Sequence, residues 1–142
     1  MVTGPESGTA VTLQAASWAD GGGVVLAYRG AAATPIQAVS ALAVNDNGAT
    51  GDVTSALVNG VSWSGSANVV SLVLMSWQPN SAALTWPSGY TLQATATDSY
   101  SSVAVGANVT SQTATSLGPR IVTLSTPQAV VPTLQLAVLV GS

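Results

Sequence analysis

Apolar and polar residues alternate one by one along much of this chain. In the stretch 90–97, a tyrosine, a leucine and two alanines share one side, while three threonines and a glutamine share the other. The stretches 11–16 and 103–110 follow the same rule. Because successive side chains of a β-strand point to opposite faces, this alternation predicts strands with one buried and one exposed face. The threonines fit such an outer face, since threonine packs well on a pleated surface.

Turn-forming residues interrupt the alternation at short intervals. They occur at 20–23, 45–48, 59–60, 78–80, 87–89 and 118–119, where glycine, asparagine and aspartate tolerate positive φ and proline fixes the entry to a turn. The runs between them predict about nine to ten short strands, near residues 9–16, 23–29, 36–44, 53–58, 61–64, 68–77, 90–97, 100–110, 120–125 and 131–140. Many short strands separated by turns predict an all-β fold, here an antiparallel β-sandwich of jelly-roll-like type.

The chain reads as one domain. Residues 9–142 contain no linker and no internal repeat, and residues 1–8 are expected to form a flexible N-terminal arm with little to bury. The first residues lack the basic start and apolar core of a signal peptide. One local alternative concerns Ala31–Ala43, which is rich enough in alanine for a short helix, although Pro35 and β-branched neighbours argue against it.

Two of the predicted strands carry apolar residues on both faces. They are Val69–Trp77 and Leu134–Val140. In a two-layer sandwich each strand needs only one apolar face, which points to the core. The second apolar face must therefore meet a neighbouring subunit or lie beneath a long loop, and the sequence leaves both explanations open.

Charged residues are scarce, and this changes the expected surroundings of the protein. The chain contains no lysine, histidine or cysteine, its only cations are Arg29 and Arg120, and charged residues make up 5% of 142. With 47% hydrophobic residues and a mean hydropathy of +0.46, little charge repulsion keeps copies apart, which favours association with other proteins. A net charge of −3 and two distant arginines argue against binding nucleic acid. No apolar run approaches the length of roughly 18 to 20 residues that a membrane helix needs.

The composition also excludes most catalytic and metal chemistry. Without histidine, lysine or cysteine the usual bases, nucleophiles and zinc ligands are missing, and no G-x-S-x-G motif is present, so we predict no enzyme and no cofactor. Asp46 and Asp52 could approach each other across one loop, or bind calcium together with Asn45 and Asn47, but no glutamate completes a calcium loop. An ordinary turn explains these residues better, and we predict no metal site.

Four aromatic residues are candidates for contacts with a partner or ligand. Trp63 and Trp77 lie within predicted strands, which makes them core or interface anchors. Trp86 precedes a Pro-Ser-Gly-Tyr turn and is the best candidate for an exposed ring. Together with Tyr90 it could stack on a sugar, which keeps a carbohydrate-binding module open as an alternative function.

Three segments carry a resemblance to a known group of proteins. They are Val24–Gly30 with its Tyr-Arg-Gly ending, Leu84–Leu92 with Trp-Pro-Ser-Gly-Tyr-Thr, and the closing Leu134–Val140. Their order resembles β-sandwich domains of tailed-phage virion proteins, especially capsid decoration and minor tail proteins of actinobacteriophages. The resemblance implies a capsid decoration (cement) protein on the exterior of the virion, often a trimer, which contacts major capsid subunits and stabilises the phage head. The alternative that it implies is a tail or fibre module that binds a receptor or carbohydrate.

Overall fold

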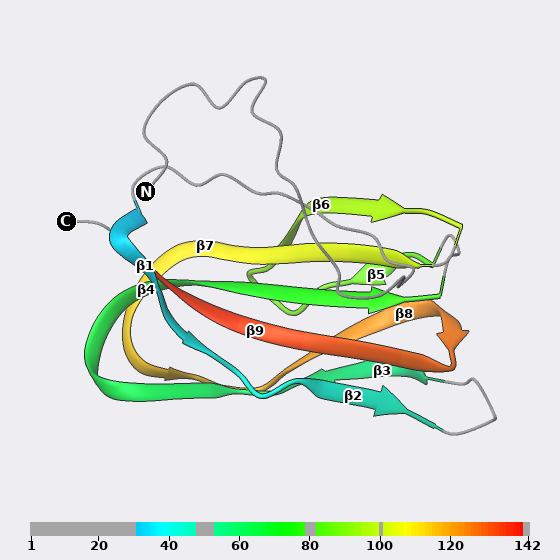
Figure 1. The fold of residues 1–142 in the computed structure, drawn as a ribbon, viewed down its shortest axis with the longest axis horizontal. Helices are drawn as coiled ribbons and strands as arrows, with labels where there is room; N and C mark the ends of the chain where they lie inside the picture. Colours follow the sequence, from blue (N-terminus) through cyan, green and yellow to red (C-terminus); the bar gives the residue numbers. More distant parts are fainter. Residues whose placement is uncertain (1–30, 48–52, 79–81, 100, 141–142) are drawn as a thin grey trace, which may run out of the picture.

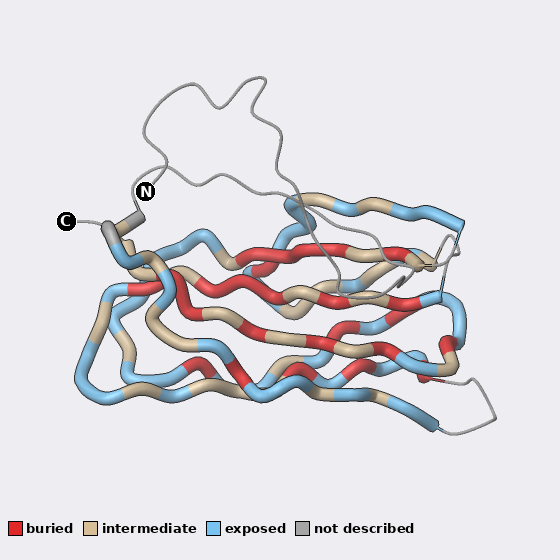
Figure 2. The backbone as a smooth tube through the Cα atoms, in the orientation of Figure 1, coloured by how far each residue is buried: buried red, intermediate tan, exposed pale blue. Residues whose placement is uncertain are grey.

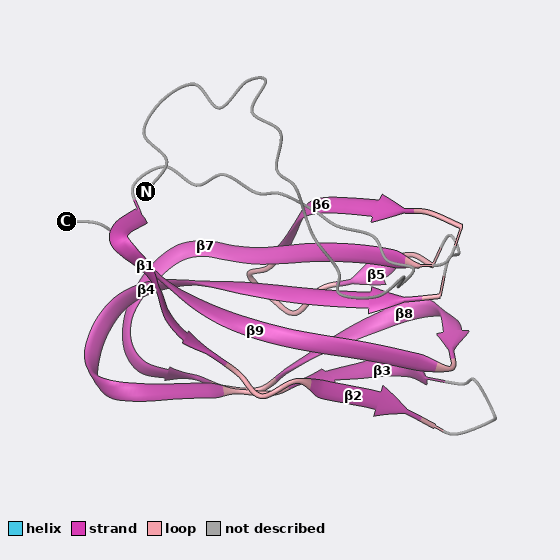
Figure 3. Cartoon of the chain, viewed as in Figure 1, coloured by secondary structure: helices cyan, strands magenta, loops and turns pink. Residues whose placement is uncertain are grey.

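The computed structural model describes residues 31–47, 53–78, 82–99 and 101–140. The predicted arm 1–8 and the predicted strands 9–16 and 23–29 lie outside this part of the chain. The described residues form nine strands and no helix, as Figure 3 shows. The strands are β1 (Ala31–Val39), β2 (Ala43–Asp46), β3 (Val53–Val58), β4 (Val61–Trp77), β5 (Leu84–Thr85), β6 (Thr91–Thr97), β7 (Ser102–Leu117), β8 (Arg120–Gln128) and β9 (Val130–Val140).

The strands form two antiparallel sheets, which confirms the predicted β-sandwich. The larger sheet, here called sheet A, has the order β1-β9-β4-β7-β6, and β2 also pairs with β9. The smaller one, sheet B, has the order β3-β8-β5. The main core lies between them and joins inward residues of β4, such as Val73 and Met75, to Val58, Val122 and Leu124 of sheet B. Figure 2 shows that the buried positions concentrate along β4, β7 and β9.

A continuous two-stranded ribbon connects the two sheets. The segment that leads from β3 into β4 runs antiparallel to the segment that leads from β7 into β8. Residues Ser55–Ser62 face Ser116–Thr123 in one register, although the ribbon passes from sheet B to sheet A between Val58 and Val61. At the change, a Cβ on Gly60 would lie 2.9 Å from the carbonyl oxygen of Leu117, so only glycine allows the backbones to approach this closely. In Figure 1 the β4–β7 part of the ribbon bends around one end of the sandwich.

A side chain bridges the two sheets at another edge. Asn45 on β2 donates from its amide nitrogen to the carbonyl oxygens of Leu57 (2.9 Å) and Val131 (2.8 Å), and its amide oxygen accepts from the N–H of Leu57 (2.7 Å). The hydroxyl of Thr133 on β9 also donates to the carbonyl oxygen of Leu57 (2.5 Å). These bonds take the place of backbone pairing between β2 and β3, so the sandwich is closed here by side chains.

The structure differs from the sequence prediction in the lengths of several strands. The predicted strands 61–64 and 68–77 are one strand, β4, because a bulge with Gly65 at φ +77° carries the pairing with β7 across the apparent break. The alanine-rich stretch is strand β1, which excludes a helix there. β5 was not predicted, since its two residues are too few to show a periodicity.

Candidate functional site: the outer face of sheet A

The outer face of sheet A is apolar across its three central strands. The register of β4 with β7 and β9 places the outward Leu72 between Ala107 and Leu136. Two residues further along β4, Leu74 likewise lies between Val105 and Leu134. Leu72, Ala107 and Val138 form a hydrophobic cluster of their own, against which Val70, Leu74 and Leu136 pack. This cluster is separate from the core between the sheets. The two strands predicted to be apolar on both faces, β4 and β9, are neighbours in sheet A, and their outward apolar faces form one continuous surface.

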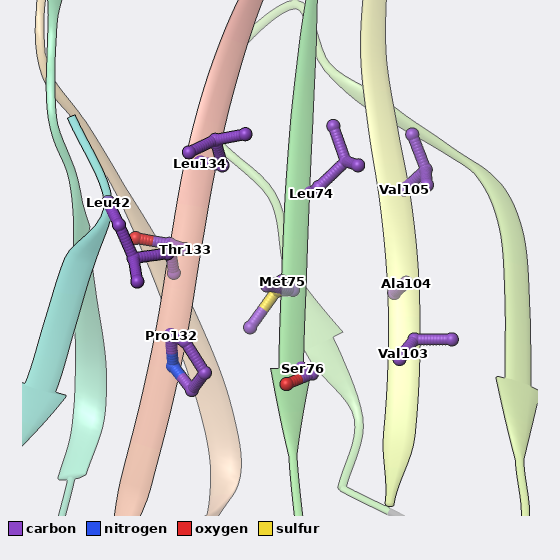
Figure 4. A pocket seen from close by; sticks show the side chains of 10 residues that line it. All are labelled: Leu42, Leu74, Met75, Ser76, Val103, Ala104, Val105, Pro132, Thr133 and Leu134. Atoms are coloured by element: carbon purple, nitrogen blue, oxygen red, sulfur yellow. The ribbon is translucent and has the colours of Figure 1, made fainter. Parts of the chain in front are cut away.

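One end of this outer face is hollowed. A hollow of about 360 Å³ lies where β4 ends and where β7 and β9 begin. Figure 4 shows its lining on these three adjacent strands, together with Leu42 from the segment before β2. Outward residues form most of the lining, namely Leu74, Ser76, Val103, Val105, Pro132 and Leu134. Since Ser76 is the one outward residue with a polar side chain among them, the hollow suits an apolar group.

A row of exposed apolar side chains borders the hollow along β1, β2 and the start of β9. We call it the edge strip; each member is 38–58% exposed, and its residues are Ile36, Val39, Leu42, Val44 and Val130. Pairing with β9 places Ile36 opposite Val138, Val39 opposite Leu136 and Val44 opposite Pro132, so these residues share the outer face. Contiguous exposed apolar surface of this kind marks sites of interaction.

Charge is nearly absent from this surface. Among the residues that the structure describes, the charged ones are Asp46, Asp98 and Arg120. Asp46 closes β2 opposite Val130, at the end of the edge strip, and Asp98 follows β6. Arg120 begins β8 in sheet B, where its guanidinium lies 5.9 Å from the centre of the Tyr90 ring. The hollow and most of the edge strip thus offer a partner no ionic contact.

The four candidate aromatic residues lie mainly inside the protein. Trp77 and Tyr90 belong to the core between the sheets, and Trp63 packs on a second core cluster near the bend of the ribbon. Trp86, the best candidate for an exposed ring, is half-buried. Its indole lies against the backbone of Gly106 on β7, where a Cβ would stand only 2.4 Å from the ring, and it packs on the core. The missing side chain of the glycine leaves the space that the indole fills.

A polar network lies within the sandwich. The side-chain amide of Gln135 lies 3.0 Å from the Ser71 hydroxyl and 3.2 Å from the Tyr90 hydroxyl, and its other end lies 3.1 Å from the carbonyl oxygen of Asn59 and 3.2 Å from that of Gly118. Because carbonyl oxygens only accept, the amide nitrogen donates to these two and the amide oxygen faces the hydroxyls. The network completes the hydrogen bonding where the ribbon changes sheet.

The predicted turn residues give no further site. The described residues contain no group of three or more acidic, histidine or cysteine side chains that could hold a metal ion. Asp52 lies outside the described part, so the distance between Asp46 and Asp52 stays open. No helix within the described ranges is long and apolar enough to cross a membrane.

Sequence reasoning found part of the candidate surface and missed the rest. The apolar outward faces of β4 and β9 were visible as runs without alternation. The edge strip was not visible in the sequence. Ile36 reaches the outer face of sheet A through shifts in register along β1. Val44 reaches the same face after the chain is held to β9 at Ser40, whose hydroxyl accepts from the N–H of Gln135 (2.9 Å). No local pattern in the sequence announces such shifts.

Comparison with known proteins gave no relative. No protein-family model, no curated protein and no solved structure matches this chain.

Proposed function

We propose that this chain is a non-enzymatic structural protein of a virion, a capsid decoration protein that stabilises a phage head by packing against major capsid subunits. The observation that carries the proposal is the uncharged apolar surface formed by the edge strip and the hollow. Its partner is expected to be a protein surface that is apolar and uncharged, with a side chain that fills the hollow. Permanent interfaces are hydrophobic in this way, whereas transient ones carry more polar and charged groups.

The placement in a virion rests on the sequence resemblance alone. Of the three segments that carry it, two fall within the described residues. Leu84–Leu92 spans β5, a turn in which the N–H of Tyr90 donates to the carbonyl oxygen of Pro87 (3.0 Å), and the start of β6. Leu134–Val140 lies in β9, beside the candidate surface. The alternative, a tail or fibre module that binds a receptor or carbohydrate, has less support, because Tyr90 is buried in the core and Trp86 is half-buried against it.

The test introduces charge at two positions of the edge strip. Leu42→Asp with Val44→Asp is compared with Leu57→Asp plus Ile121→Asp, a matched pair of exposed apolar residues on sheet B. Each variant replaces the natural chain in the virus that encodes it, and the copies per purified particle are measured by quantitative mass spectrometry. We expect hundreds of copies of the natural chain and of the sheet B variant, and loss of the edge-strip variant.

Three other results would overturn the proposal. Absence of the natural chain from purified particles refutes a virion protein, and a handful of copies refutes a shell protein in favour of the tail. Loss of the sheet B variant with retention of the edge-strip variant refutes the assigned surface.

A further inference from the structure

The edge strip and the hollow lie on opposite sides of β9, on the same face of sheet A. Val44 of the edge strip pairs with Pro132 of β9. On the other side of β9, Thr133 pairs with Met75, so Ser76, the next residue of β4, lies level with Pro132. Val44, Pro132 and Ser76 therefore form one row across the sheet, in which neighbouring strands lie about 4.8 Å apart. Val44 and Ser76 are thus equally far from β9.

The two ends of this row differ in height. Val44 is 58% exposed, so most of its side chain projects from the sheet. Ser76 has the smallest side chain among the outward residues that line the hollow. Figure 4 shows Ser76 between Pro132 and Val103, on the three adjacent strands. The face therefore carries an apolar projection and a depression, placed symmetrically about β9.

This symmetry is the one that a twofold interface needs. In such an interface both copies use the same patch, so a projection on each copy must find a depression on the other. A twofold axis that runs along β9, above the face, exchanges the two sides of that strand. It brings Val44 of each copy over Ser76 of the other, while β9 lies against β9. Sheets packed face to face lie about 10 Å apart, and their side chains interdigitate.

The distribution of charge also favours a second copy. None of the residues that line the hollow is charged, so a charged partner group would be buried there without a counter-ion. A second copy brings only the apolar Val44 to the hollow. Asp46 lies two residues further along β2, opposite Val130. The twofold axis keeps the Asp46 residues of the two copies on opposite sides of the interface, so these like charges do not meet.

We propose that the free chain forms a reversible dimer through this surface, with Val44 of each copy seated in the hollow of the other. The hollowed end of the face is four strands wide and about seven residues long, which is roughly 450 Å² per copy. Two copies together cover about 900 Å², in the range of weak, transient interfaces. The dimer can therefore give way to a partner that offers a larger contact. The inference concerns the free chain and does not depend on the proposed function, in which another protein takes this surface.

Disulfide trapping tests the arrangement, because the chain has no cysteine of its own. The full chain with Val44→Cys and Ser76→Cys is oxidised mildly and run on a non-reducing gel. Within one copy these positions lie two strands apart, about 9.6 Å, whereas the Cβ atoms of a disulfide lie about 3.5–4.5 Å apart. We expect a covalent dimer as the main product, since a twofold contact closes on itself. A chain that stays uncrosslinked, or a ladder of longer species, refutes the arrangement.

Chains with a single cysteine are the matched controls. A mixture of Val44→Cys and Ser76→Cys chains should give at least about tenfold more crosslinked dimer than either chain alone, because like positions lie about 9.6 Å or more apart across the axis. Replacing the first chain by Ile121→Cys, which carries its cysteine at an exposed position of sheet B, should give only the background. Equal yields from the two mixtures refute the assigned contact.

Sedimentation equilibrium follows the association of the natural chain. We expect the mass to rise from that of one chain toward that of two between about 1 μM and 1 mM. Val44→Asp should weaken the association at least about tenfold, and Ile121→Asp should leave it unchanged. A monomer at every concentration, or equal effects of the two substitutions, refutes the dimer. These measurements use the purified chain alone, whereas the proposed function is tested by copies per virus particle, so either can fail without the other.

Discussion

Replacing Gly106 by alanine should strain the core at one defined contact. The added Cβ would stand 2.4, 2.5 and 2.7 Å from three ring carbons of Trp86, whereas carbon atoms in contact prefer about 3.5–4.0 Å. The backbone cannot retreat, because Gly106 lies on β7 and pairs with Val73 on one side and Leu92 on the other. The indole must therefore move by about 1 Å or more, away from a well-packed position. Overpacking of this kind costs about 1–3 kcal/mol, and we expect the upper end of the range.

Urea denaturation and thermal unfolding measure this cost. A loss of about 3 kcal/mol corresponds to a decrease in Tm of roughly 10 °C for a chain of this size. Gly118→Ala is the matched control, since its nearest neighbour is a guanidinium nitrogen of Arg120 at 3.7 Å and its φ is not positive. The control should stay within about 0.5 kcal/mol of the natural protein.

A double-mutant cycle assigns the strain to the indole. Trp86→Ala alone should destabilise the protein by about 3–5 kcal/mol through the lost packing. In that background Gly106→Ala should cost little, because the ring that it strikes is gone, which gives a coupling free energy of about 2–3 kcal/mol. The reasoning is refuted if Gly106→Ala costs the same in both backgrounds, or no more than Gly118→Ala in the natural one.

Two further stability predictions concern side chains that close the sandwich. Gln135→Leu leaves the carbonyl oxygens of Asn59 and Gly118 without their donor and the paired hydroxyls of Ser71 and Tyr90 without the amide acceptor, and should lower the free energy of unfolding by about 3 kcal/mol, while the exposed Gln112→Leu should change it by less than about 0.5 kcal/mol. Asn45→Ala removes two hydrogen bonds to Leu57 of β3 and one to Val131 of β9 and should cost about 2–3 kcal/mol, against a negligible change for the exposed Asn68→Ala. Urea denaturation tests both, and equal effects in a variant and its control would contradict the role assigned to that side chain.

The alternation of side chains was sufficient to predict where many strands lie, but not how long they are. The bounds of β3 agree with the prediction, because one of its faces meets the core and the other meets water, and the bounds of β6 differ from the prediction by one residue. β4 looked like two strands, since Gly65 and its serine neighbours resemble a turn. A bulge keeps the chain in the ladder there, and the bulge depends on the pairing with β7, which is remote in sequence.

The positions of Trp86 and Gln135 depend even more on contacts between strands that are distant in the sequence. Trp86 precedes a proline turn and therefore looked exposed, yet the space that receives its ring is created by Gly106, twenty residues away on another strand. Gln135 interrupts the apolar run of β9, and the sequence gives no sign of which side it faces. It points inward because the ribbon leaves two carbonyl oxygens unpaired at the sheet change, and the amide supplies their donor.

The distribution of polar groups explains why this fold can combine a defined structure with an apolar exterior. Buried polar side chains such as Gln135, Ser71 and Thr133 form their hydrogen bonds in only one arrangement of the strands, since a shift of register by one residue would turn them to the other face of the sheet and leave their buried partners unpaired. The interior therefore selects the register by hydrogen bonds. The outer face of sheet A is then free to be almost wholly apolar, with the hollow at one end and the edge strip beside it. In the proposed function, a neighbouring protein packs on this open surface.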